Sequence, residues 1–128
     1  MSSLIQITWV IAAMHPKEIA SFYSNAFDID FYQVDNSGDH WLSKSDGADI
    51  QIYKPSDQKP FPSRGKAGSI CFSEKSSGDP LSQIKEWIQK LSEYGAKTCE
   101  DFNNKPFGVE CWMQDPEGNY FLLLVKKD

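Results

Sequence analysis

Apolar residues alternate with polar ones in several short segments of the first half of the chain, which is the pattern of half-buried β-strands. Isoleucine or tryptophan occupies every second position from Ile5 to Ile11, which predicts a first strand with one strongly apolar face. Further segments of this kind lie at 29–34, 40–44 and 49–53, separated by Asn-Ser-Gly and Ser-Asp-Gly turns. The pattern therefore predicts four strands before residue 54.

Two other segments carry apolar residues at spacings of three and four, which is the period of an amphipathic helix. Pro16 and Glu18 suit the first turn of one helix, and its apolar positions follow as far as Phe27. Asp79 and Pro80 suit the N-cap and first position of a second helix, and Gly95 suits its end. The expected core positions of the second helix are Leu81, Ile84, Ile88 and Leu91.

The second half repeats the order of the first, with strands predicted at 69–73, 97–102, 107–114 and 120–125 around the second helix. We therefore expect an α+β fold of two tandem βαβββ modules that form one cleft-bearing curled sheet. A single domain, 1–128, would comprise module one at 1–53, a linker at 54–68 and module two at 69–128. The linker is rich in proline and glycine, so it is either a plain surface connection or a lid over the cleft.

Composition narrows the class of protein. The net charge of -5, from 13 basic and 18 acidic residues, disfavours nucleic acid and anionic membranes as partners. No apolar run approaches the roughly 18 residues of a membrane span, and no Lys or Arg precedes the apolar segment at 4–14 as in a signal peptide. Cys71, Cys99 and Cys111 lack C-x-x-C spacing, which favours free thiols in a cytoplasmic protein.

Four motifs in order along the chain resemble the vicinal oxygen chelate superfamily, which holds glyoxalase I, bleomycin-resistance proteins and extradiol dioxygenases. The motifs are Ile7-Thr8-Trp9-Val10, Ser21-Phe22-Tyr23, Lys105-Pro106-Phe107-Gly108 and Asp115-Pro116-Glu117-Gly118-Asn119. The resemblance implies two modules curled around a cleft with the helices outside, often in a homodimer.

Catalytic members of that superfamily bind one divalent metal through His, Glu or Gln side chains on four strands. The resemblance places these ligand positions at Thr8, Gln51, Ser69 and Leu122, and only Gln51 matches a family ligand type. Hydroxyl and amide oxygens without imidazole or carboxylate hold first-row metals poorly. We therefore expect no metal and no cofactor.

The strand at 107–114 offers the best-placed carboxylate of the cleft. If Val109, Cys111 and Met113 face the helix, then Glu110 and Trp112 face the cleft. Glu110 would be a general base, a counter-charge for a cationic ligand, or a strand residue with no special role. For the two histidines, we expect His15 to be a capping residue at the first helix, and His40 to be either a surface residue or a cleft residue.

The favoured function is metal-independent binding of a small aromatic, hydrophobic or cationic molecule, similar to that of bleomycin-resistance proteins. One alternative is a glyoxalase-superfamily lyase, isomerase or dioxygenase whose metal site is non-standard or lies at positions other than the four aligned above. A second is a metal-free enzyme that uses Glu110, and a third is an interaction module whose cleft is filled by its own side chains. A homodimer with a small-molecule ligand is expected. The expected ligand contacts are Thr8, Gln51, Tyr53, Ser69, Glu110, Trp112, Tyr120 and Leu122.

Overall fold

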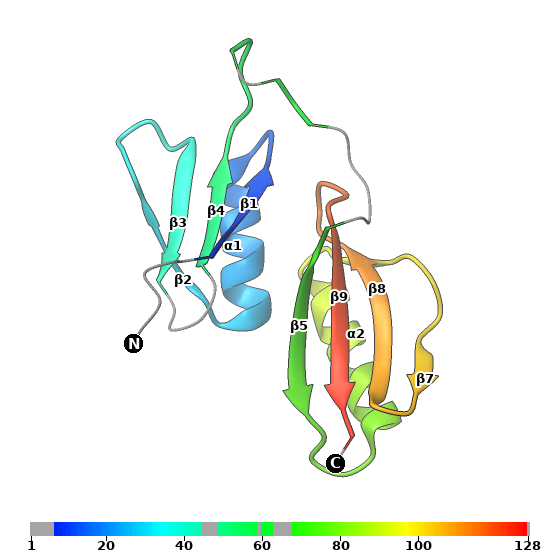
Figure 1. Cartoon of the computed structure of the whole chain (residues 1–128). Helices are drawn as coiled ribbons and strands as arrows, with labels where there is room; N and C mark the ends of the chain where they lie inside the picture. The colour runs from blue at the N-terminus through cyan, green and yellow to red at the C-terminus, as the bar shows by residue number, and fades with distance from the viewer. Residues whose placement is uncertain (1–6, 45–48, 59, 63–67, 128) are drawn as a thin grey trace, which may run out of the picture. The chain divides into compact units, whose positions relative to one another are not determined.

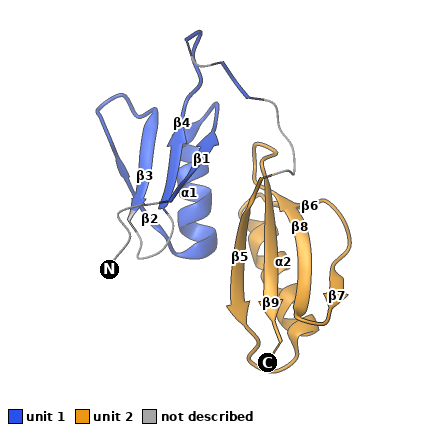
Figure 2. Cartoon of the chain, in the orientation of Figure 1, with its two compact units in different colours: residues 1–63 blue, residues 64–128 orange. Residues whose placement is uncertain are grey.

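The chain divides into two compact units, Met1–Ser63 and Arg64–Asp128 (Figure 2). A computed structural model describes residues 7–44, 49–58, 60–62 and 68–127. In the described part of each unit, one helix covers one face of one sheet (Figure 1), which confirms the predicted α+β class. The division falls inside the 54–68 segment; its residues 59 and 63–67 lie outside the described residues. One continuous curled sheet with a cleft stays a prediction.

The first unit contains a four-stranded sheet in the order β1-β4-β3-β2, in which β1 and β4 are parallel and the other pairs antiparallel. Two predicted strands, 40–44 and 49–53, are confirmed to the residue. The prediction for the first strand is wrong at its start. Ile7 is expected on the apolar face, but it lies before the strand and is 65% exposed. The elements are β1 (Thr8–Ala12), α1 (Pro16–Phe27), β2 (Asp30–Gln33), β3 (His40–Lys44) and β4 (Asp49–Tyr53).

Helix α1 begins where the sequence predicts, with Pro16 at its first position and Glu18 in its first turn. His15 is the N-cap residue, but its side chain makes no capping hydrogen bond. The helix packs Ile19 and Tyr23, which are both fully buried, against the sheet. It ends at Phe27, after which Asp28 turns the chain with a left-handed backbone at φ 56°.

The second unit contains a five-stranded sheet in which β5 and β9 are parallel and β9 pairs antiparallel with β8. The short strands β6 and β7 both pair with β8. Helix α2 packs against β8 and β9 (Figure 1). The elements are β5 (Ile70–Lys75), α2 (Pro80–Glu93), β6 (Lys97–Thr98), β7 (Asn103–Lys105), β8 (Gly108–Gln114) and β9 (Tyr120–Lys126).

The predicted signals at both ends of α2 are confirmed, since Asp79 caps its start and Gly95, with a positive φ of 104°, follows its end. The Asp79 carboxylate accepts a hydrogen bond from the Leu81 N–H at 3.2 Å, and Pro80 is the first helical residue. Of the four predicted core positions, Ile84 and Leu91 are fully buried, while Leu81 and Ile88 are half-buried. Neither α1 nor α2, the two helices of the described residues, is long and apolar enough to cross a membrane.

The segment 97–114 differs from its prediction. The strand expected at 97–102 ends at Thr98, and Asn103–Lys105 forms an additional strand that pairs with β8. Lys105 pairs with Gly108, so Pro106 and Phe107 form a two-residue turn and Phe107 is 55% exposed. The predicted strand therefore breaks at 99–102, and the chain returns to β8 as the separate short strand β7.

The closing hairpin between β8 and β9 is organised by one buried carboxylate. Asp115 is 1% exposed, and its Oδ1 accepts hydrogen bonds from the Glu117 N–H at 2.8 Å and the Asn119 N–H at 3.0 Å. Its Oδ2 accepts a third from the Asn119 side-chain amide at 3.0 Å. Gly118 takes a positive φ of 87° in the same turn, a conformation that glycine adopts without strain. The motif thus fixes the geometry of the hairpin.

Gly108 marks the other end of β8, where two backbones come very close. It is buried, and a Cβ built on it would lie 2.4 Å from the Val125 carbonyl oxygen on the neighbouring strand. Atoms of real side chains do not approach a backbone oxygen so closely. Only glycine therefore fits this position without a shift of β8 or β9.

Candidate functional site

The face of the first sheet that is turned away from α1 is called the first open face. Ile11, Ile50 and Ile52 are buried on the helix side, so their strand neighbours point the other way. Strand register places Gln51 between Val10 and Leu42 in one row. The next row holds Tyr53 between Ala12 and His40, and Thr8 lies beside Asp49. Three predicted contacts, Thr8, Gln51 and Tyr53, thus share one face.

The face of the second sheet that is turned away from α2 is called the second open face. Val109, Cys111 and Met113 are buried on the helix side, as the sequence predicts. Register then places Trp112 beside Leu122, which lies beside Cys71. Glu110 lies beside Leu124, and Gln114 beside Tyr120. Side chains of this face on β8 and β9 are half-buried, namely Glu110, Trp112, Gln114, Tyr120, Leu122 and Leu124.

The four positions that the resemblance assigns to a metal are divided between the units. Thr8 and Gln51 lie on the first open face, and Leu122 lies on the second. Ser69 is half-buried and lies directly before β5. It is two residues from Cys71, the partner of Leu122, so the alternation of the strand places it on the same side as these two residues. A leucine cannot coordinate a metal, and among the described residues no group of three or more His, Cys, Asp and Glu could hold one. The donor set therefore does not fit the superfamily's usual metal.

Two thiols of the second sheet are held in their neutral form. Burial raises the pKa of Cys111 to about 11, with the Glu100 carboxylate adding to the effect. Cys71 is exposed at the edge strand, yet partial desolvation and then the negative charge of Glu110 raise the pKa of its thiol as well. At neutral pH neither thiol is a ready nucleophile, because the thiolate is the reactive form.

The influence of Glu110 on Cys71 yields a pH-dependent prediction. Since a raised pKa keeps the thiol protonated to higher pH, Cys71 should react with iodoacetamide more slowly at pH 8 than an unperturbed cysteine. Glu110→Gln should lower the pKa of Cys71 and speed its alkylation at that pH, which peptide mass spectrometry measures. The control is Glu93→Gln at the end of α2, which also removes one negative charge, and it should leave the alkylation rate of Cys71 unchanged. Equal rates in Glu110→Gln and wild type would place Glu110 too far from Cys71 to act on it.

Comparisons with known proteins identify the fold. No protein-family model matches the chain, and no curated protein matches it in sequence. Solved structures do. A glyoxalase/bleomycin resistance protein/dioxygenase family enzyme from Burkholderia phytofirmans PsJN has a TM-score of 0.75 at 11% identity, over 93% of this chain and 96% of that one. The chain has the glyoxalase/bleomycin-resistance fold. This is the fold of the vicinal oxygen chelate superfamily, as the sequence motifs predict.

Two further solved structures match the chain over almost their full lengths. A glyoxalase/bleomycin resistance protein from Albidiferax ferrireducens T118 has a TM-score of 0.68 at 19% identity, over 97% of this chain and 99% of that one. The genomically encoded fosfomycin resistance protein from Listeria monocytogenes has a TM-score of 0.66 at 16% identity, over 98% and 93%. At such identities the likeness establishes the fold alone.

Several residues of the open faces were not among the predicted contacts. Val10 and Leu42 flank Gln51 on the first face, and Cys71 and Leu124 lie beside predicted residues on the second. Leu124 could have been found, because it continues the alternation of Tyr120 and Leu122. The others depend on strand register, which the sequence pattern alone does not give.

Proposed function

We propose that this chain of glyoxalase/bleomycin-resistance fold binds a small aromatic or hydrophobic molecule at its second open face, without a metal. The observation that carries the proposal is the pair of Trp112 and Leu122, directly opposite each other on adjacent strands and both half-buried. A flat apolar surface of this kind suits a planar ring. Tyr120 and Leu124 continue that surface along β9.

Glu110 gives the proposed site its polarity. It lies two residues before Trp112 on β8, on the same face, and is the one acidic residue among the described strand residues of the second open face. A carboxylate beside an aromatic surface favours a ligand that carries a cationic or hydrogen-bond-donating group. Lys75 and Lys126 lie one further repeat along the sheet, beyond Glu110, so the ring is expected on the Trp112 side.

The absence of a metal requirement in this proposal rests on donor chemistry. Leu122 occupies the position where the superfamily resemblance places a carboxylate ligand, and Thr8 and Ser69 stand where it places His or Glu. Neutral hydroxyl groups contribute too little charge to displace the hydration shell of a divalent ion. Electrophilic catalysis by a substrate-chelating metal is therefore not part of the proposed function.

Ligand binding should be visible in tryptophan emission. We expect planar aromatic amines to quench the emission of the wild-type chain saturably, and Trp112→Phe to remove most of that response while weakening binding modestly. Trp87→Phe, a half-buried position on α2, is the matched control and should keep the response. Glu110→Gln should weaken binding of the amines by about tenfold but leave neutral aromatic analogues unchanged, the scale of one charge-assisted hydrogen bond.

Three outcomes would contradict the proposal. Equal loss of quenching in Trp112→Phe and Trp87→Phe would mean that the quenching does not report contact of the ligand with Trp112. A broad panel that changes neither emission nor thermal stability would favour a face filled by the protein's own side chains. Near one equivalent of zinc, nickel, iron or manganese retained after dialysis of untagged protein would favour the metal-dependent alternative. Homodimer assembly and a cytoplasmic location stay predictions.

A further inference from the structure

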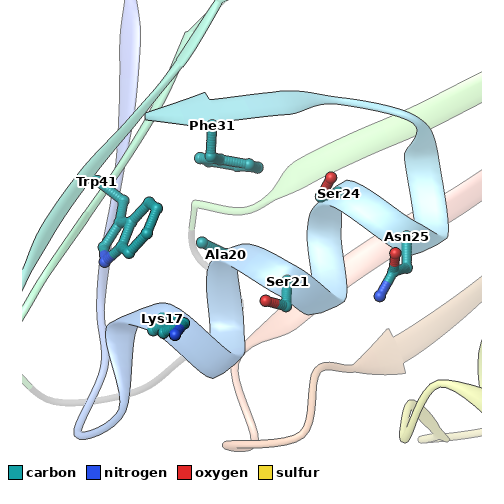
Figure 3. A pocket seen from close by; sticks show the side chains of 7 residues that line it. All are labelled: Lys17, Ala20, Ser21, Ser24, Asn25, Phe31 and Trp41. Carbon is teal, nitrogen blue, oxygen red and sulfur yellow. The ribbon is translucent and has the colours of Figure 1, made fainter. Parts of the chain in front are cut away.

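A pocket of about 180 Å³ lies in the first unit on the opposite side of its sheet from the first open face. It opens between α1 and the β2–β3 hairpin (Figure 3). Its volume far exceeds the roughly 30 Å³ that one water occupies, and it is smaller than the roughly 300 Å³ at which pockets for drug-sized ligands begin. The space suits a molecule with a single ring.

The pocket exists because small side chains on α1 lie opposite large rings on the sheet. Ser24 lies four residues after Ala20 and three after Ser21, the spacings of neighbours on a helix surface, and all three line the pocket. Phe31 on β2 and Trp41 on β3 form the opposite wall (Figure 3). Leucine at the serine positions would fill the gap, as apolar residues do elsewhere along helix–sheet contacts.

The aromatic wall is held in place by strand pairing and by one hydrogen bond. Phe31 pairs with Ser43 and Trp41 pairs with Gln33, so the two rings are diagonal neighbours on the same side of the sheet. The Trp41 indole N–H donates to the Gly38 carbonyl oxygen at 2.9 Å, which fixes the plane of the indole. Binding of a ring against this wall should therefore cost little side-chain conformational entropy.

The charge of the pocket is opposite to that of the chain. The net charge of the protein is -5, yet among the described residues that line the pocket Lys17 alone is charged. Lys17 is the second residue of α1, where the positive end of the helix dipole also favours an anion. The hydroxyl groups of Ser21 and Ser24 add donors along the same wall.

We propose that this pocket is a second binding site, independent of the second open face, for a small aromatic carboxylate. The ring lies against Trp41 and Phe31, and the carboxylate accepts hydrogen bonds from the Lys17 ammonium group and the Ser21 hydroxyl. An aromatic cation is disfavoured because its charge would meet Lys17. A purely apolar ligand would gain nothing from Lys17 or from the hydrogen bonds that the serine hydroxyl groups can donate.

The test uses the full chain and benzoate as the probe, with benzamide as its neutral counterpart. Heteronuclear NMR resolves the indole N–H groups, so Trp41 reports the pocket and Trp112 reports the second open face. Benzoate should shift the Trp41 resonance saturably and leave that of Trp112 in place, and benzamide should bind more weakly. Lys17→Gln should weaken benzoate binding by about threefold to tenfold, the range expected for an exposed charge-assisted contact.

Two variants complete the test. Ser21→Leu places an apolar side chain in the pocket at an exposed helix position and should abolish the shift of Trp41 while the far-ultraviolet circular dichroism stays that of the wild type. Lys90→Gln, an exposed lysine of α2, is the charge-matched control and should bind benzoate like the wild type. Shifts that do not saturate, unchanged affinity in Lys17→Gln, or binding that survives Ser21→Leu would each overturn the proposal. Shifts at Trp112 alone would place benzoate at the second open face instead.

Discussion

Replacing Leu123 by alanine is expected to lower the free energy of unfolding by about 2–5 kcal/mol, the range for a large-to-small change in a packed core. Leu123 is fully buried on the helix-covered side of β9, so the loss combines its transfer free energy with the cavity left beneath α2. Urea denaturation at equilibrium, with the slope of the transition compared with that of the wild type, measures the change.

The neighbouring leucines are the matched controls. Leu122 and Leu124 undergo the same chemical change on the same strand, but they point to the second open face and are half-buried. Each alanine substitution there should cost about 1 kcal/mol, in proportion to the smaller apolar area removed from water. Equal losses at Leu122 and Leu123 would show that both faces of β9 are packed as core, which would leave no surface for the proposed ligand.

The second large effect is expected at the closing hairpin, where Asp115→Ala should lower the free energy of unfolding by about 3 kcal/mol, because it removes hydrogen bonds to a charged acceptor. The substitution leaves the Glu117 and Asn119 backbone N–H groups without the carboxylate that now orders the turn. Thermal and urea denaturation should both register the loss. Asp115→Asn retains one acceptor oxygen and should lose less.

Asp79→Ala is the control for this prediction. Asp79 also accepts a backbone hydrogen bond, from Leu81, but it is exposed at the start of α2. Loss of an exposed N-cap costs about 1 kcal/mol, because water replaces the lost acceptor. If Asp79→Ala and Asp115→Ala were equally destabilising, burial of Asp115 would not be the reason for its importance.

Most of the fold was predictable because each element carries its own local signal. The Asp79-Pro80 pair and Gly95 mark the ends of α2, and the Asn36-Ser37-Gly38 turn separates β2 from β3. The Ser-Asp-Gly turn predicted at 45–47 lies outside the described residues. Those signals are properties of a few adjacent residues. The strand Asn103–Lys105 was missed because its three polar residues show no alternation, and only pairing with β8 makes it a strand.

The candidate sites were predictable only in part. Alternation along β8 correctly separated buried Cys111 from half-buried Trp112, since a strand shows its two faces in sequence. Neighbours on other strands, such as Leu42 beside Gln51, depend on register. The pocket at Trp41 was not predicted at all. Small residues on a helix indicate a pocket only when the residues that pack opposite them are known. Here those residues lie on β2 and β3, and the sequence does not show that these strands pack against this face of α1.

The close approach at Gly108 has a consequence for the evolutionary record of this fold. Because the 2.4 Å distance from a built Cβ to the Val125 carbonyl oxygen involves backbone on both sides, no change of neighbouring side chains can relieve it. Any relative that keeps both the β8–β9 register and this spacing of the two backbones must keep glycine here, whatever it binds. Residues of the second open face are free of that constraint and can diverge with the ligand. An alignment of distant relatives is therefore better anchored on Gly108 than on any side chain proposed to touch a ligand.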